Sequence, residues 1–267
     1  MKRKKQQQGK TLKFAIIFCL GVLFLILMSI GVKSLFLIKN SSFDGVNRFN
    51  VGIFQSNQTS VVSFSPQNHI ITVLNLKGKL ANTNLSQYLE LPIDATITTE
   101  NATFDKKNIA PIFWKLLSHY SDKNTSLTII DIFRIWNFAK DVGQDSIYQR
   151  DVSVNDTLTI NSFVSSFFID SAISNEKTTI EVINATSVYG LANRLATFIA
   201  NIGGDVVLVT SSDKPTETSE ILYSGELNYT VKKISKILGA EPVKASKRDI
   251  SDVTIIIGKD ALSSLRF

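Results

Sequence analysis

The sequence offers few side chains for catalysis or metal binding. Imidazole chemistry is limited to His69 and His119, and the single cysteine, Cys19, can form neither an internal disulfide nor a cysteine-based zinc site. Neither histidine has acidic or thiol side chains at the spacing of a metal site or a catalytic triad, so both are interpreted as structural. The pair Gly203-Gly204 follows a helical pattern, which is typical of a helix end and not of a phosphate-binding loop. The sequence therefore predicts no catalytic residue, no metal ligand and no cofactor.

The positive charge of the chain is concentrated at its start. The 267 residues include 29 lysines and arginines and 23 aspartates and glutamates, for a net charge of +6. Six of the basic residues precede residue 14, so the rest of the chain is neutral overall. These six are Lys2, Arg3, Lys4, Lys5, Lys10 and Lys13. The charge therefore predicts no basic groove for DNA or RNA, and nucleic acid is not expected as a partner.

An apolar span, residues 14–32, follows the basic residues. As a helix it would be roughly 28 Å long, close to the thickness of the hydrocarbon core of a bilayer. A core helix would show a polar face, and a cleaved signal peptide has a shorter apolar region followed by small residues at its cleavage site. The span has no polar face, and its apolar region is longer and lacks such a cleavage site. We therefore expect an uncleaved transmembrane signal anchor.

The distribution of basic residues predicts the orientation of this anchor. Residues 1–13 form a basic tail that stays in the cytoplasm, and residues 33–267 lie outside the cell membrane. Residues 33–48 are expected to form a juxtamembrane stalk. A cytoplasmic regulator with a membrane tether would need the opposite orientation, against the charge distribution.

Residues 49–170 read as a first α/β region. Alternating apolar residues predict strands at 49–54, 60–65 and 70–76, with a hairpin turn at 66–69. Apolar residues at helical spacing predict amphipathic helices at 109–120 and 129–142. The set Trp114, Tyr120 and Trp136 is expected to pack in the core, and a carbohydrate-stacking platform is the alternative. The wide apolar stripe of 129–142, which includes Phe133, is expected to be buried, and contact with a partner or with the bilayer surface is the alternative.

A second α/β region, residues 178–267, follows a polar link at 170–177. The expected elements are strands at 178–183, 206–209 and 219–223, helices at 188–202 and 227–238, and final strands near Val243 and at 253–257. The apolar run 206–209 predicts a strand that is covered on both faces or central in its sheet, and the polar turn 184–187 can supply a helix N-cap. Lys232, Lys233 and Lys236 are expected to face solvent. This order of elements indicates a two-layer α/β sandwich with helices on one face. Both regions are assigned to the α/β (α+β) class as two-layer sandwiches.

The motifs of this second region resemble the LytR/CpsA/Psr C-terminal domain over residues 178–260. That family reads V-x-N-G-T, then G-L-A, and closes on an apolar strand that ends in G-x-D. The matching residues here, to which we assign structural roles, are Asn184, Thr186, Gly190, Leu191, Ala192, Gly258 and Asp260. One departure is Ala185, where the family has glycine.

Residues 49–170 are more faintly similar to the LytR/CpsA/Psr catalytic domain, which attaches glycopolymers to peptidoglycan by phosphotransfer from a polyprenyl-pyrophosphate carrier. The hairpin matches, but Ser60 stands where the family has an acidic residue, and Lys77-Gly78-Lys79 replaces Pro-Arg-Asp. Pyrophosphate chemistry needs carboxylates for a divalent cation and arginines for phosphate. Between residues 49 and 91 the sequence has only Glu90 as an acid and no arginine, so an active site of this type would be lost.

Two functions follow from these observations. The first is a membrane-anchored protein of the bacterial cell envelope with a non-catalytic binding or scaffold role in cell-wall organisation. Its expected partners are the membrane, together with peptidoglycan, an anionic wall polymer or an envelope protein. The alternative is a diverged glycopolymer–peptidoglycan phosphotransferase. An enzyme would gather acids and arginines beside one cleft, whereas a scaffold would expose an apolar or aromatic patch.

Overall fold

The computed structural model describes residues 2–78, 80, 84–99, 104–121, 124–246 and 250–261. The chain forms two compact units, Met1–Ser41 and Ser42–Phe267. The first unit is helix α1 (Lys2–Lys39), whose apolar stretch Ile16–Lys33 is unburied, and long and apolar enough to cross a membrane. No proline interrupts α1, so the helix extends beyond the predicted span at both ends.

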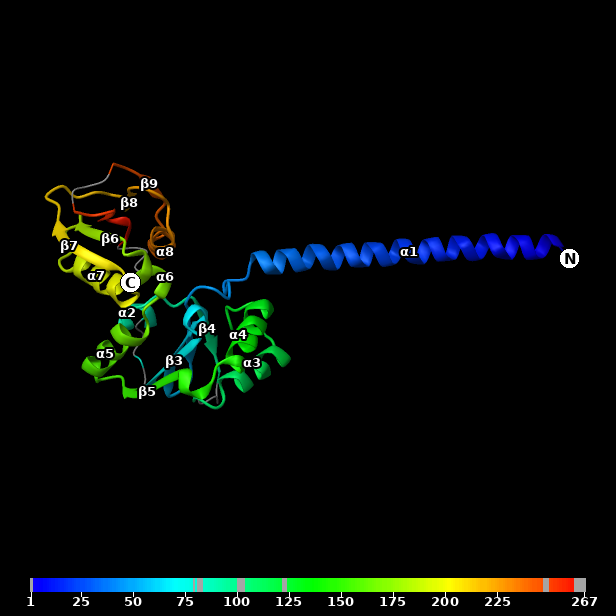
Figure 1. Ribbon diagram of the computed structural model, residues 1–267, viewed down its shortest axis with the longest axis horizontal. Coiled ribbons are helices and arrows are strands. Elements are labelled where there is room, and N and C mark those ends of the chain that lie inside the picture. The colour runs from blue at the N-terminus through cyan, green and yellow to red at the C-terminus, as the bar shows by residue number, and fades with distance from the viewer. Residues whose placement is uncertain are drawn as a thin grey trace. The chain divides into compact units, whose positions relative to one another are not determined.

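The second unit has the mixed α/β class that the sequence predicts, with two five-stranded sheets (Figure 1). The first sheet has the strand order β4-β1-β2-β3-β5. Its strands are β1 (Phe49–Phe54), β2 (Gln58–Ser65), β3 (Ile70–Lys77), β4 (Ala95–Thr98) and β5 (Ile147–Ser153). The predicted hairpin is confirmed: β2 and β3 pair antiparallel from Gln58↔Lys77 to Ser65↔Ile70. The short 3-10 helix η1 (Pro66–Asn68) and left-handed His69, with φ of 55°, form its turn.

Helices cover both faces of this first sheet, which makes one layer more than the sequence predicted. On one face lie α3 (Ile109–Ser118) and α4 (Ile129–Asp141), which pack against Val62 and Val73. On the other face lie α2 (Leu85–Leu89) and α5 (Thr157–Phe167), which pack against Val61 and Leu74. Successive residues of a strand point to opposite faces, and here both faces are apolar, so each face requires a covering layer.

The second sheet has the strand order β7-β6-β10-β8-β9. Its strands are β6 (Thr179–Asn184), β7 (Asp205–Ser211), β8 (Glu220–Tyr223), β9 (Pro242–Lys244) and β10 (Val253–Ile257). Helices α7 (Leu191–Asn201) and α8 (Tyr229–Leu238) pack against one face of this sheet and share one buried cluster with it. The predicted order of elements and the two-layer arrangement of this sheet with its helices are confirmed. We call the first sheet with α2, α3, α4 and α5 the first lobe, and the second sheet with α7 and α8 the second lobe.

Several local predictions for this part of the chain were wrong. Strand β7 lies at the edge of its sheet and its burial alternates, although its apolar run predicted a central strand. Helix α7 begins only after Gly190, whose φ of 81° makes it the N-cap in place of the polar turn 184–187. The link at 170–177 contains a helix, α6 (Ser171–Glu176), because the Asp170 side chain accepts a hydrogen bond from the Ala172 N–H and caps it.

A shared hydrophobic core joins the two lobes. Leu74 and Phe168 belong to this core together with Ile202, which follows α7, and Tyr229 and Ile237 of α8 pack against it. Among the residues that the structure describes, the three buried clusters all lie between residues 43 and 261. The unit Ser42–Phe267 therefore contains its own cores and can fold without α1.

Candidate functional site

A cleft of about 410 Å³ lies between the two lobes. The first lobe contributes β1, α2 and the loop that leads to β4, and the second contributes α7 and α8. Its apolar walls are Phe54, Leu85, Ile93, Phe198 and Ile237. Its charged side chains are Asp94, Lys233 and Lys236. A mostly apolar hollow with a few convergent polar groups is typical of a ligand site.

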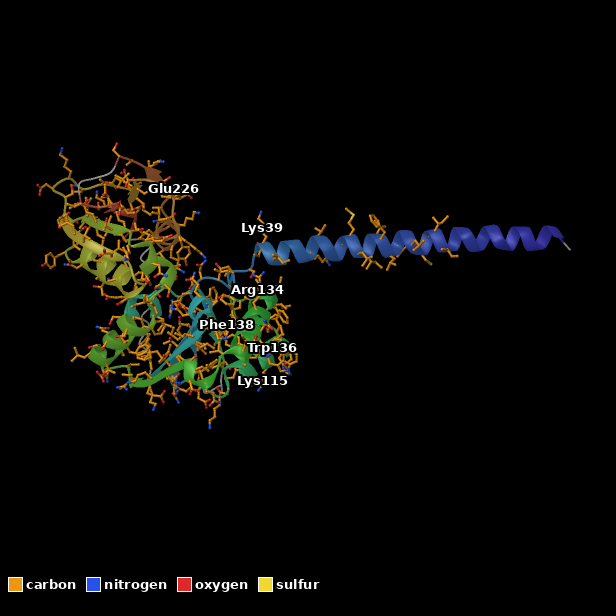
Figure 2. All side chains as sticks on the ribbon, viewed as in Figure 1. Lys39, Lys115, Arg134, Trp136, Phe138 and Glu226 are labelled. Atoms are coloured by element: carbon orange, nitrogen blue, oxygen red, sulfur yellow. The ribbon has the colours of Figure 1, made fainter. Side chains whose placement is uncertain are left out.

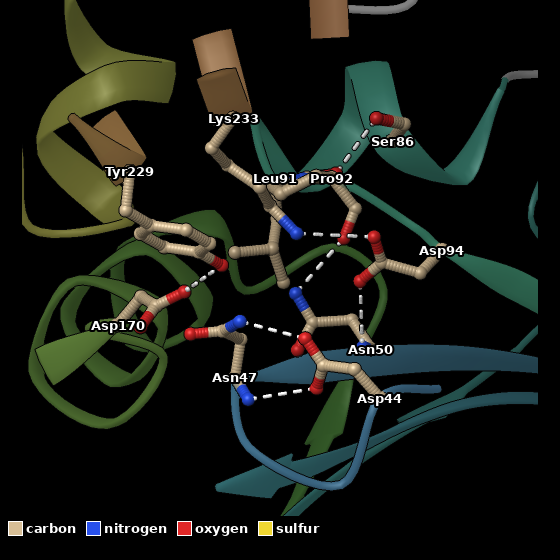
Figure 3. Close-up of polar contacts among 10 residues, drawn as sticks. All are labelled: Asp44, Asn47, Asn50, Ser86, Leu91, Pro92, Asp94, Asp170, Tyr229 and Lys233. Carbon is tan, nitrogen blue, oxygen red and sulfur yellow. Dashed lines mark hydrogen bonds and ion pairs between the residues drawn. The ribbon is translucent and has the colours of Figure 1, made fainter. Parts of the chain in front are cut away.

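An ion pair crosses the boundary between the lobes at this cleft. Lys233 Nζ of α8 lies 3.1 Å from Asp94 Oδ1, and the two side chains are only 12% and 9% exposed. Figure 3 shows Lys233 reaching Asp94 beside Pro92. The prediction that Lys233 faces solvent was therefore wrong. Charges that are this buried require partners, and this pair connects two segments that are 139 residues apart.

Backbone contacts fix the position of Asp94. Its Oδ2 accepts a hydrogen bond from the Asn50 N–H at 2.9 Å, and its own N–H donates to the Asn50 carbonyl at 2.8 Å. Asn50 Nδ2 in turn donates to the Pro92 carbonyl. The preceding turn is held by Ser86 Oγ, which donates to the Leu91 carbonyl at 2.7 Å. The carboxylate is thus presented to Lys233 from a rigid loop.

A second polar group lies behind the cleft and also joins the lobes. The Tyr229 hydroxyl donates to Asp170 Oδ2 at 3.0 Å (Figure 3). Burial raises the pKa of the Asp170 carboxyl above its usual value, and burial together with Asp170 raises the pKa of the Tyr229 phenol well above its usual range. Burial lowers the pKa of the nearby Arg48 guanidinium to about 10, so Arg48 stays charged at neutral pH and attracts Asp170.

Sequence reasoning missed the Asp94–Lys233 pair, although α8 carries a signal of it. Val231, Ile234 and Leu238 form the apolar stripe that faces the second sheet. Tyr229 and Ile237 lie one turn to either side of Lys233 and pack against the core that the two lobes share, so they define a second contact face. A helix with apolar residues on two of its sides packs against two neighbours, and the spacing of the apolar residues in α8 indicates this. Nothing in the sequence identified Asp94 as the partner.

The family-motif residues near β6 organise the loop that leads to α7. Asn184 Oδ1 accepts hydrogen bonds from the N–H and the hydroxyl of Thr186, and Asn184 Nδ2 donates to the Val188 carbonyl. Gly190 adopts the positive φ required at the helix start, and Leu191 and Ala192 are buried against the sheet. None of these five motif residues lines the cleft.

The motif residues after β10 hold the strand to the segment that precedes β8. A Cβ on Gly258 would lie 2.3 Å from the carbonyl carbon of Thr218, so only glycine permits this approach. Asp260 Oδ1 accepts hydrogen bonds from the N–H and hydroxyl of Ser219, at 2.9 and 2.6 Å. These contacts position the backbone and offer no reactive group.

A polar network occupies the place where the catalytic-domain resemblance requires an acidic residue. Ser60 Oγ donates to Asn75 Oδ1 at 2.7 Å, and Asn75 Nδ2 donates to Asp151 Oδ1 at 2.9 Å. Lys77 Nζ lies 3.4 Å from Asp151 Oδ2. The hydrogen bond from Asn75 lowers the pKa of the Asp151 carboxyl. The four side chains thus contact one another and link β2, β3 and β5.

The two histidines are both tied to helix ends. His69 Nε2 lies 3.1 Å from the carbonyl oxygen of Asp141, at the end of α4, and His119 Nδ1 lies 3.2 Å from the carbonyl of Lys115. Across the described ranges, no three histidine, cysteine, aspartate or glutamate side chains are grouped to hold a metal ion.

The aromatic residues of α3 and α4 are less buried than the sequence predicted. Trp114 is 52% exposed and Phe133 is 50% exposed, whereas Tyr120, Trp136 and Phe138 are partly buried against the core. The expected packing of all these residues in the core was therefore wrong for Trp114 and Phe133. Their inward neighbours, Phe113 and Ile132, already fill the space above the sheet.

Comparison with known proteins gives one informative match. No curated protein matches the chain in sequence. Among solved structures, the Lin1025 protein of Listeria innocua (9% identity, 82% of this chain, 95% of that chain) has a TM-score of 0.19. Lmo1026 of Listeria monocytogenes (9% identity, 82% and 94%) has a TM-score of 0.18, and scores this low support no argument. The family model described as LytR cell envelope-related transcriptional attenuator matches residues 177–260, which confirms the resemblance predicted for the second lobe.

Proposed function

We propose that the protein is a single-pass, membrane-anchored protein of the bacterial cell envelope, with a non-catalytic binding role in cell-wall organisation outside the membrane. The observation that carries this proposal is the cleft between the lobes. It is built partly from a lobe that matches a cell-envelope family, and it offers apolar walls and a lysine to a ligand.

The N-terminal segment supports the location. An apolar helix preceded by six basic residues is the arrangement of a signal anchor whose N-terminus stays in the cytoplasm. Residues 33–267 would then lie outside, where the family description of residues 177–260 is consistent with an envelope role.

The lining of the cleft suits a ligand that has an apolar part and an anionic part. Lys233 is already paired with Asp94, whereas Lys236 lines the cleft and is exposed. A sugar or polyol unit packs its carbon faces on apolar walls, and a phosphate or carboxylate beside it would meet Lys236. We therefore propose a segment of anionic wall polymer as the ligand, in preference to bare peptidoglycan or an envelope protein.

Retention on isolated cell-wall sacculi tests this function. The unit Ser42–Phe267 should be retained by intact sacculi and released when their anionic polymers are stripped. Lys236→Gln should weaken retention about fivefold, because one cation near an anionic surface contributes about 1 kcal/mol. Lys232→Gln removes an exposed lysine from the same helix but outside the cleft, so it should bind like the wild type. Equal retention of all three proteins, or none by any wall preparation, would exclude the cleft as a polymer site.

Cysteine labelling tests the orientation. The single cysteine, Cys19, can be replaced by serine, and Tyr189→Cys then places a thiol at a side chain that is 99% exposed. A membrane-impermeant maleimide should label the Tyr189→Cys variant in intact cells. It should label a Lys4→Cys variant only after the membrane has been permeabilised. The reverse pattern would contradict the proposed topology.

The phosphotransferase alternative retains one supporting feature, the hairpin of β2 and β3 with its proline turn. Titration of Ser42–Phe267 with inorganic pyrophosphate and Mg²⁺ separates the two functions. The mutual contacts of Ser60, Asn75, Asp151 and Lys77 lead us to expect no heat of binding. Saturable binding that Asp151→Asn abolishes would favour the enzyme.

A further inference from the structure

Helices α3 and α4 present an apolar aromatic surface beside their buried residues. We define the aromatic face as Trp114, Ile129, Phe133 and Trp136. Trp114, Phe133 and Ile129 are 52%, 50% and 44% exposed. The ring centroids of Trp114 and Trp136 are 4.8 Å apart and those of Phe133 and Trp136 are 5.7 Å apart, so the rings form one continuous patch. Exposed apolar residues that touch one another mark an interaction surface.

Basic side chains accompany this patch. Lys140 Nζ lies 5.1 Å above the Trp136 ring, and Lys115 is exposed beside Trp114 in the last turn of α3. Figure 2 shows Lys115, Trp136 and Arg134 along the α3–α4 helix pair. Tryptophan combined with lysine or arginine is the composition of protein surfaces at a membrane interface, where the rings lie at headgroup level and the cations meet phosphates.

The chain that leads from α1 is fixed to this same part of α4. The Phe43 N–H donates to Asp131 Oδ1 at 2.8 Å, and Arg134 Nη1 donates to the Phe43 carbonyl at 2.9 Å. Asp131 and Arg134 lie in the same turns of α4 as Ile129 and Phe133. Helix α1 ends at Lys39, and the four residues from there to Phe43 can extend at most about 14 Å. A span by α1 would therefore keep this end of α4 close to the bilayer surface.

We propose that the aromatic face inserts into the interface of the membrane that α1 spans, among the headgroups of the outer leaflet. The inference rests on the proposed anchoring by α1 and goes beyond it, because it gives the folded unit a second membrane contact. The occupant is the phospholipid interface itself. The short tether raises the local concentration of lipid at the face, so a small patch is sufficient for stable contact. Such a contact restricts how the cleft can turn relative to the membrane.

The tryptophans of the chain report this contact directly. The sequence contains two tryptophans, both on the aromatic face, and α1 contains none. The full chain is reconstituted in phosphatidylcholine–phosphatidylglycerol vesicles, with lipids either unmodified or brominated on the acyl chain near the headgroup. We expect about twofold lower tryptophan emission with the brominated lipid, since interfacial side chains reach this depth.

Substitutions distinguish insertion from chance collisions. Ile129→Gln combined with Phe133→Gln removes apolar area from exposed positions and keeps both reporters, so it should abolish at least about half of the quenching. Leu158→Gln is the matched control, because Leu158 is 83% exposed and lies on α5 outside the face, and it should leave the quenching unchanged.

Flotation of the vesicles after alkaline washing measures the anchoring separately. Flotation with unquenched emission would overturn the inference and leave the anchoring intact. Failure to float would overturn both. If tryptophan emission falls with rising protein density in the vesicles and does not respond to lipid bromination, the face contacts a second copy of the chain. This result would also overturn the inference.

Discussion

The buried ion pair between the lobes gives a sharp test of the fold. We consider Lys233→Met, which keeps the length of the side chain and removes its charge. Asp94 Oδ1 then loses its partner at 3.1 Å, in a place where the Asp94 side chain is 9% exposed. The carboxylate keeps one hydrogen bond, from the Asn50 N–H to Oδ2.

The expected cost follows from this geometry. Two unit charges at such a distance attract by about 5 kcal/mol at an effective dielectric constant of about 20. Removal of one partner from a buried pair typically costs about 3–5 kcal/mol, because the other charge stays buried and unpaired. Since Asp94 keeps its contact with Asn50, we expect Lys233→Met to lower the free energy of unfolding by about 3 kcal/mol. Adding Asp94→Asn removes the stranded charge, so the double variant should lie within about 1 kcal/mol of the wild type.

Urea unfolding of the unit Ser42–Phe267, followed by two signals, measures this coupling. Tryptophan emission reports the first lobe, where both tryptophans lie, and far-ultraviolet circular dichroism reports both lobes. If the shared core and the ion pair unite the lobes, Lys233→Met must shift both transitions together, although Lys233 belongs to the second lobe. Two results would refute the reasoning. One is a loss of unfolding free energy below about 0.5 kcal/mol for Lys233→Met, and the other is a double variant whose loss equals the sum of the losses for Lys233→Met and Asp94→Asn alone.

Three further predictions concern stability. Asp131→Ala removes the hydrogen bonds from the Phe43 and Thr128 N–H groups and should cost about 2–4 kcal/mol in urea unfolding; a loss under 1 kcal/mol would show that these bonds are dispensable. Gly258→Ala forces a Cβ against backbone and should cost about 2–3 kcal/mol, whereas Gly143→Ala, with φ of −65° and open space, should be nearly neutral; equal melting temperatures for the two would contradict the steric argument. The pKa of Asp151 is lowered in the folded state, so its ionised form stabilises the fold above the ordinary aspartate pKa, and this contribution is lost as the pH falls through the lowered value. Asp151→Asn should therefore be less stable than the wild type at pH 7 by chemical denaturation, and the difference should shrink as the pH falls below the ordinary aspartate pKa; a difference that grows on acidification would have the wrong sign.

The second lobe could be predicted almost entirely from the sequence because its signals are local. Helix α8 shows a strong apolar stripe and ends at Gly239, whose φ is 70°, and the strands are apolar runs between polar turns. The error at β7 is instructive. A continuous apolar run predicts burial on both faces, but a bulge near Ile180 shifts the register, and the strand lies at the edge with alternate side chains exposed.

The first lobe was harder to predict because its missing elements depend on distant partners. Strand β5 has the sequence IYQRDVS, and its charged residues conceal a strand that pairs parallel with β3 some 75 residues earlier. Helix α2 has only five residues and is stabilised by the Asn84 cap and by Ser86. Neither element has enough periodicity to be seen alone.

The cleft itself shows where sequence resemblance stops being informative. The motif residues stabilise the second lobe from within: Asn184 fixes a loop, and Gly258 and Asp260 hold the last strand to its neighbour. The cleft uses other side chains of that lobe, on the second contact face of α8, and completes them with a loop of the first lobe. A match to the motif therefore describes the scaffold, whereas the proposed ligand binding would depend on Lys236 and on the walls that the first lobe supplies.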